Sequence, residues 1–249
     1  MILNTVEAGE GPPLVLLHGL FGQARNFGAV QRRLSAERRV IAPDLRNHGA
    51  SPHDPHVDYA TMAADVAETL NALGVSRADI VGHSMGGKVA MTLALTAPER
   101  VARLVISDIA PVTYAPAFRA MAAAMQSVPA GAPRAAAGAA LAGSVPDAGT
   151  LAFLLANRLP DGSGWRIGLD EIAAALPIIE AWTAPDGARF DGPTLFVSGE
   201  RSDYIQREHR APIRALFPAA RFITVKGAGH WVHADNPDGF SAVLEAFLA

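Results

Sequence analysis

A serine stands between two glycines in the segment Gly82-His83-Ser84-Met85-Gly86, directly after a short apolar run. The run predicts a strand and the apolar residues that follow predict a helix, so the serine falls on the turn between them. Such a turn presents a serine hydroxyl to a base and to a substrate. Small flanking residues allow the strand and the helix to pack closely around it. The pattern therefore predicts Ser84 as a nucleophile.

A serine hydroxyl needs a general base, and one of the eight histidines is well placed for that role. His230 lies in the glycine-rich segment GAGHWVH, between the last predicted strand and the last predicted helix. A loop at this point can carry an imidazole over the sheet edge to Ser84. We therefore predict His230 as the base.

The remaining histidines have other interpretations. His233 and Asp235 lack the further ligands of a metal site, so no metal is predicted. His18 lies before Gly19 at the end of a predicted strand and is expected to make structural hydrogen bonds. Three histidines in one loop are expected to be solvated or turn residues: His48, His53 and His56.

The base needs a carboxylate to orient it, and the residues leave two candidates open. Asp108 ends the apolar run LVISD, and Asp203 lies in SGERSDY after the next predicted strand. Both segments leave the same edge of the predicted sheet, so either carboxylate can reach His230. Each is also an ordinary turn or helix N-cap residue.

Backbone N–H groups are expected to stabilise the oxyanion of an attacked acyl group. The amide of Met85 begins the helix after the serine, where the helix dipole favours negative charge. The segment LLHGLFG, residues 16–22, supplies a second turn at the same edge. We predict the amide of Leu20 as the second donor, with that of Phe21 as an alternative.

These residues are positioned by alternating strand and helix patterns. Val-, Ile- and Leu-rich runs that end in Gly, Asp or Ser are typical of strands buried in a parallel sheet. They fall at 14–19, 39–44, 78–84, 103–108, 193–200 and 220–230. Helical patterns fall at 61–74, 86–99, 208–218 and 237–249. The predicted fold class is α/β.

Residues 112–190 depart from this alternation. Alanine dominates there, with Pro and Gly breaks, and the pattern predicts several short helices and no strand. Large aromatic residues in the segment argue against a low-complexity linker. We therefore predict one domain whose core is 1–111 and 191–249, with a helical insertion at 112–190.

Composition excludes several classes of protein. The 249 residues suit one domain, and the net charge of −3 with no basic stripe gives no sign of nucleic-acid binding. The absence of cysteine excludes disulfides. No uncharged apolar run reaches the roughly 18 residues of a membrane span, and the start of the chain does not resemble a signal peptide. We expect a cytoplasmic protein, monomeric or homodimeric, that needs no cofactor and shows no nucleotide fingerprint.

Together these segments resemble the α/β-hydrolase superfamily, with HGLFG, GHSMGG and GAGHW in the order serine, acid, histidine. Three strings resemble the small YbfF-type esterase subgroup more closely: DLRNHGASPH (44–53), GHSMGGKVAM (82–91) and SDIAPV (107–112). The resemblance implies a mostly parallel sheet of about eight strands flanked by helices. It also implies a helical cap, formed by roughly 112–190 and inserted after strand six.

The resemblance also bears on the acid. The common superfamily pattern has aspartate in a G-x-x-D segment after the seventh strand, where this chain has Ser202, one residue before Asp203. Members of the subgroup use the aspartate of DIAPV instead, which favours Asp108. Lys88, one helical turn beyond Ser84, is another subgroup feature and is expected to form a salt bridge beneath the site.

The leading expectation is a serine carboxylic-ester hydrolase that acts on short to medium acyl esters, or acyl thioesters, through an acyl-enzyme. The same triad would serve perhydrolysis of the haloperoxidase type, lactone opening or C–C bond hydrolysis. A binding protein on a hydrolase fold is the non-enzymatic alternative. Six residues are expected to border the substrate: Phe21, His83, Phe118, Phe153, Trp182 and Trp231.

Overall fold

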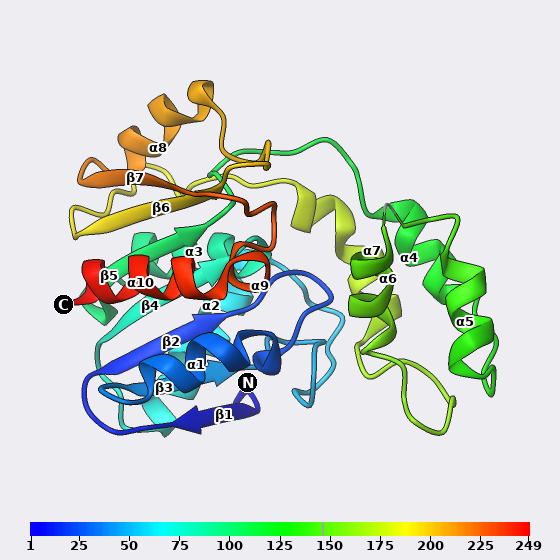
Figure 1. The fold of residues 1–249 in the computed structure, drawn as a ribbon. Helices are drawn as coiled ribbons and strands as arrows, with labels where there is room; N and C mark the ends of the chain where they lie inside the picture. The colour runs from blue at the N-terminus through cyan, green and yellow to red at the C-terminus, as the bar shows by residue number, and fades with distance from the viewer. Residues whose placement is uncertain (146) are drawn as a thin grey trace.

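The computed structural model describes residues 1–145 and 147–249. Its centre is a sheet of seven strands in the order β1-β3-β2-β4-β5-β6-β7 (Figure 1). β1 pairs antiparallel with β3, and the other neighbours pair in parallel. The strands are β1 (Thr5–Ala8), β2 (Pro13–Leu17), β3 (Arg39–Pro43), β4 (Ala78–His83), β5 (Val101–Ser107), β6 (Thr194–Gly199) and β7 (Ala220–Val225).

The predicted α/β class is confirmed, and each of the six strands predicted from apolar runs has a counterpart. β1 was not predicted, because it lies at the sheet edge, where its four residues are half-buried or exposed and form no apolar run. The strand predicted at 220–230 ends at Val225, and Gly227 then turns the chain with a φ of 69°. The sheet therefore has seven strands in the described residues, rather than the eight or so that the resemblance implies.

Helices cover both faces of the sheet because its strands alternate their side chains between two apolar clusters. Leu14 and Leu16 of β2 belong to one cluster, with α1 (Gly28–Leu34) and α10 (Pro237–Leu248). Val15 and Leu17 belong to the other, with α2 (Tyr59–Ala72) and α3 (Met85–Thr96). α8 (Arg210–Leu216) flanks the β7 end of the sheet (Figure 1). Four short elements complete this part: η1 (Ala24–Phe27), η2 (Pro98–Arg100), η3 (Arg207–His209) and α9 (Val232–Asp235).

Four helices lie beyond the carboxyl ends of the parallel strands (Figure 1). They are α4 (Arg119–Gln126), α5 (Arg134–Leu141), α6 (Ala148–Leu155) and α7 (Leu169–Glu180). They follow β5 in the chain, whereas the resemblance places the insertion after a sixth strand. Apart from an isolated bridge between Arg158 and Trp165, the described part of 112–190 has no strand pairing. Its division from the core as a separate cap remains a prediction.

No helix among the described residues is both long enough and apolar enough to span a membrane.

Candidate active site

Ser84 lies on the turn between β4 and α3, where it is the N-cap residue, with φ 51° and ψ −119°. A positive φ is uncommon for a residue with a side chain and is found where the surroundings hold a strained turn in place. The flanking glycines explain how the turn fits. A Cβ on Gly86 would lie 2.4 Å from the backbone oxygens of Leu17 and His18, and one on Gly82 would lie 2.3 Å from the oxygen of Gly86.

His230 joins Ser84 to a buried carboxylate. Its Nε2 lies 3.1 Å from Ser84 Oγ, and its Nδ1 lies 2.8 Å from Oδ2 of Asp108. A carboxylate accepts, so Nδ1 carries the proton and Nε2 is left to accept from the serine hydroxyl. Asp108 is fully buried, and its Oδ1 accepts the Gly199 N–H at 3.1 Å. The structure thus brings Ser84, His230 and Asp108 into one hydrogen-bonded chain.

The other candidate acid lies apart from this chain. Asp203 is exposed, and its carboxylate accepts a hydrogen bond from the Gln206 side chain at 3.2 Å. Ser202, at the position where the superfamily pattern has aspartate, donates its hydroxyl to Oδ2 of Asp108. The loop after β6 therefore supports the carboxylate that follows β5 and supplies none of its own to His230.

Two backbone N–H groups are free to serve as oxyanion donors. Met85 is the first residue of α3, so its N–H has no acceptor within the helix. Among the described residues, the N–H of Leu20 also has no hydrogen-bond acceptor. The N–H of Phe21, the alternative, is already donated to Nε2 of His48 at 3.1 Å. The geometry therefore favours Leu20 over Phe21 as the partner of Met85.

His48, expected to be a solvated or turn residue, lies in a turn, where its N–H donates to the Leu45 oxygen at 2.9 Å, but it is not solvated. It is buried, and its Nδ1 lies 2.8 Å from the oxygen of Arg46 while Nε2 accepts from Phe21. Burial lowers the pKa of His48 to about 3, which keeps the ring neutral. His18 has the structural role expected of it, since its Nε2 accepts the Leu45 N–H at 2.9 Å. The loop containing His48 therefore holds the turn that presents the Leu20 amide.

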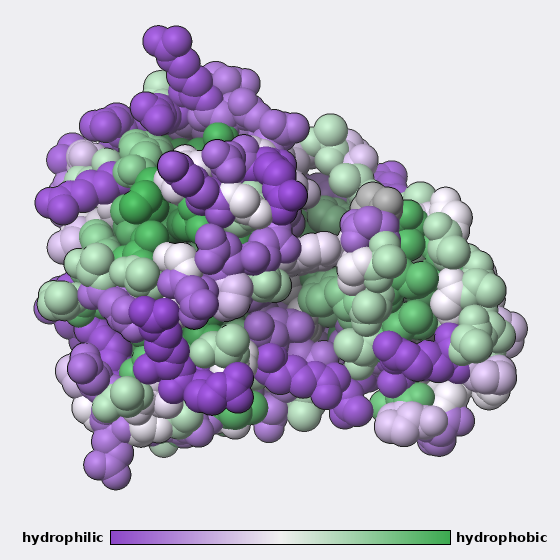
Figure 2. Space-filling view, viewed as in Figure 1, coloured by the Kyte–Doolittle hydropathy of each residue, from purple (hydrophilic) through white to green (hydrophobic). Residues whose placement is uncertain are grey.

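Ser84 lies where two cavities meet. The larger, of about 660 Å³, is also lined by five of the residues expected to border the substrate: Phe21, His83, Phe118, Phe153 and Trp231. Figure 2 shows a hollow between the part of the molecule that contains the sheet and helices α4–α7. The smaller cavity, of about 260 Å³, lies beside Met85 and Lys88. Trp182 lines neither cavity, because its ring is buried in the core, so the structure does not place it near Ser84.

The salt bridge expected for Lys88 is not formed. Its ammonium donates instead to the backbone oxygens of Ile179, Glu180 and Ala181, at 3.4, 3.2 and 3.1 Å. These oxygens end α7, where the helix dipole favours a cation. The ammonium also lies over the rings of Tyr59 and Tyr114, and burial lowers the pKa of Lys88 to about 8. Lys88 therefore ties α3 to the end of α7.

Buried neutral histidines beside the site predict loss of stability in acid. Burial lowers the pKa of His233 to about 3 from an ordinary value of 6.5, so the unfolded chain takes up this proton first as the pH falls. Each such histidine removes about 1.4 kcal/mol of unfolding free energy per pH unit between these pKa values, or about 2 kcal/mol at pH 5. The loss is absent above pH 7.

The variant His233→Phe isolates this effect, because the ring of His233 packs against Phe27 and Phe240 and phenylalanine keeps an aromatic ring there. Urea unfolding at pH 8 and pH 5 should show the variant gaining about 2 kcal/mol on the wild type as the pH falls. His56→Gln is the control, because that side chain is 85% exposed. It should not change the slope of the unfolding free energy against pH. Equal slopes for wild type and His233→Phe would contradict the assignment.

The geometry and the fold agree with the comparisons to known proteins. A family model described as the alpha/beta hydrolase fold matches residues 12–237, and the chain belongs to that family. Among its relatives is the sn-1-specific diacylglycerol lipase ABHD11 of Mus musculus, 43% identical over 96% of this chain and 81% of that protein. Another is Esterase YbfF of Escherichia coli K12, 38% identical over 95% of this chain and 92% of that protein.

A solved structure confirms the fold independently. A marine microorganism esterase superposes with a TM-score of 0.95 at 34% identity, covering 99% of both chains. The resemblance to the YbfF-type subgroup, drawn from three short strings, is confirmed over nearly the whole chain.

Proposed function

We propose that this chain is a serine carboxylic-ester hydrolase acting on short to medium acyl esters or acyl thioesters. The observation that carries the proposal is the hydrogen-bonded chain from Ser84 through His230 to Asp108, which opens on two cavities. Relatives named as an esterase and as a diacylglycerol lipase support ester bonds as the substrate class.

The proposed reaction has two halves. In the first, Nε2 of His230 takes the hydroxyl proton of Ser84 while Oγ attacks the acyl carbon, and the amides of Leu20 and Met85 hold the resulting oxyanion. The imidazolium, stabilised by Asp108, gives its proton to the leaving alcohol or thiol, and the acyl group stays on Ser84. In the second half, water attacks this ester with His230 again as base, releasing the acid and restoring the serine.

Hydrolysis of p-nitrophenyl esters from acetate to palmitate tests this function. The wild type is expected to release p-nitrophenolate with saturation kinetics and to act best on the shorter chains. Lactones, acyl thioesters and peroxide with a carboxylic acid form the comparison panel, because the same triad serves those reactions. Activity on that panel without any ester hydrolysis would contradict the proposal.

A further inference from the structure

We propose that the smaller cavity at Ser84 is the acyl subsite and that the larger cavity receives the alcohol or thiol part of the substrate. The preferred substrates would then be esters of a short, unsubstituted acyl group with a large leaving group. This inference rests on the proposed ester hydrolysis and adds to it the orientation of the substrate.

The position of His230 sets the orientation. Ser84 lines both cavities, whereas His230 lines the larger one and is not among the residues around the smaller one. His230 must donate its proton to the leaving oxygen or sulfur, which therefore lies within hydrogen-bond reach of Nε2. The leaving group is thus on the side of the larger cavity.

The smaller cavity lies on the side of the oxyanion donors. Both Leu20 and Met85 line it, and of these two Met85 does not line the larger cavity. A tetrahedral carbon on Ser84 has four substituents: the serine oxygen, the oxyanion, the leaving group and the acyl chain. With the oxyanion at the two amides and the leaving group at His230, the acyl chain points into the smaller cavity.

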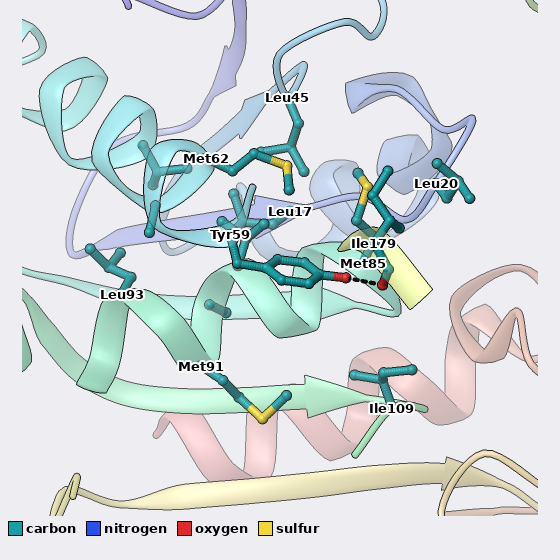
Figure 3. Packing of buried hydrophobic residues seen from close by; sticks show 14 of the residues in the cluster. Leu17, Leu20, Leu45, Tyr59, Met62, Met85, Met91, Leu93, Ile109 and Ile179 are labelled. Carbon is teal, nitrogen blue, oxygen red and sulfur yellow. Dashed lines mark hydrogen bonds between the residues drawn. The ribbon is translucent and has the colours of Figure 1, made fainter. Parts of the chain in front are cut away.

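The walls of the smaller cavity are suited to hydrocarbon. Figure 3 shows Leu20, Met85 and Ile179 close together, with the Tyr59 hydroxyl donating to the Ile179 oxygen. The Tyr114 hydroxyl is also engaged, since it donates to the oxygen of Tyr204 at 2.6 Å and accepts the Ala110 N–H at 2.8 Å. The ammonium of Lys88 already donates to three backbone oxygens at the end of α7. Two carboxylates, those of Glu180 and Asp203, also belong to the lining. Oε1 of Glu180 accepts the N–H groups of Ala117 and Phe118, at 2.7 and 3.0 Å, and Asp203 accepts from the Gln206 side chain. The rest of the wall that an acyl chain would meet is mainly aromatic and aliphatic.

The volumes of the two cavities support the same assignment. At about 30 Å³ per heavy atom, the volume of one molecule in liquid water, the 260 Å³ cavity holds about nine heavy atoms. The larger cavity, at 660 Å³, combines aromatic rings with charged side chains, including Arg201 and Asp235. Its volume, more than twice that of the smaller cavity, suits a bulky leaving group.

Two substrate series separate acyl from leaving-group recognition. One is the p-nitrophenyl esters from acetate to decanoate, and the other is the acetates of alcohols from methanol to decanol. The variant Ala117→Phe narrows the smaller cavity at an exposed residue whose backbone N–H, not its side chain, bonds Glu180 at 2.7 Å. It should lower kcat/KM for octanoate relative to acetate by about tenfold or more and leave the alcohol series unchanged.

Two further variants distinguish a change in the acyl subsite from a general folding defect. Ile179→Ala enlarges the smaller cavity and should shift the acyl optimum toward longer chains, which is the opposite change. Phe153→Ala is the matched control in the larger cavity and should alter the alcohol series without altering the acyl series. Thermal unfolding of each variant checks that it is folded.

The reversed pattern, in which Ala117→Phe changes the alcohol series and Phe153→Ala the acyl series, would overturn the assignment. A response of both series, or of neither, to Ala117→Phe would overturn it too. Failure of the underlying function looks different, because the wild type would then hydrolyse no ester in either series.

Discussion

Replacing Ser84 by alanine is expected to lower kcat for ester hydrolysis by about 10⁶-fold, to the level left by the oxyanion donors and substrate binding. The substitution removes Oγ, the atom that attacks the acyl carbon. It also leaves Nε2 of His230 without the hydroxyl that lies 3.1 Å from it in the wild type. Alanine has the same Cβ, so it adds no strain at the positive φ of this position. The measurement is kcat for p-nitrophenyl butyrate, with circular dichroism and thermal unfolding to verify the fold.

Ser107→Ala is the matched control for Ser84→Ala. Ser107 lies at the end of β5 and is fully buried, and its hydroxyl has no hydrogen-bond partner among the described residues. Removing it deletes the same atom from a buried serine and should leave kcat close to that of the wild type. A Ser84→Ala variant that retains wild-type kcat would exclude the acyl-enzyme mechanism.

Asp108→Asn is expected to lower kcat by about 10⁴-fold. The carboxylate accepts the Nδ1 proton of His230 at 2.8 Å, which leaves Nε2 free to accept from Ser84. An asparagine amide at that point can donate to Nδ1 instead, and the ring then carries its proton on Nε2, where it cannot act as a base. The loss should appear in kcat more than in KM, because Asp108 does not contact the substrate.

Asp203→Asn makes the same chemical change at the competing acid. Because Asp203 is exposed and bonds Gln206, this variant should keep nearly all of the activity. Both variants preserve side-chain volume, so thermal unfolding should reveal any indirect effect of losing a buried charge at Asp108. A larger loss for Asp203→Asn than for Asp108→Asn would move the acid to the loop after β6.

The sequence predicts the fold well where burial is complete. The residues of β4 are all buried, so their apolar run is visible without any structure. The short edge strand β1 leaves no such pattern, because its half-exposed residues are as compatible with a loop as with a strand. Trp182 shows the same limit for side chains, since its size indicates burial but not which surface it is buried against.

The sequence also predicts part of the site. Ser84 and His230 each lie in a segment whose glycines and position between elements are distinctive. In the structure Oγ of Ser84 lies 3.1 Å from Nε2 of His230. The residues could not decide between Asp108 and Asp203, because both loops leave the same sheet edge. Contacts with Gly199 and Ser202 distinguish them, and these depend on tertiary structure. The buried position of His48 was not predicted for the same reason, since its hydrogen bond with the Phe21 N–H joins residues 27 positions apart.

Covalent labelling by a fluorophosphonate tests most directly the claim that Ser84 is the nucleophile of this enzyme. Intact-mass measurement of the wild type should show one adduct, and peptide mapping should place it on Ser84. Ester hydrolysis should fall in proportion to labelling, and Ser84→Ala should take up no label. An adduct on another residue, or full hydrolysis by a protein that does not label, would contradict the account.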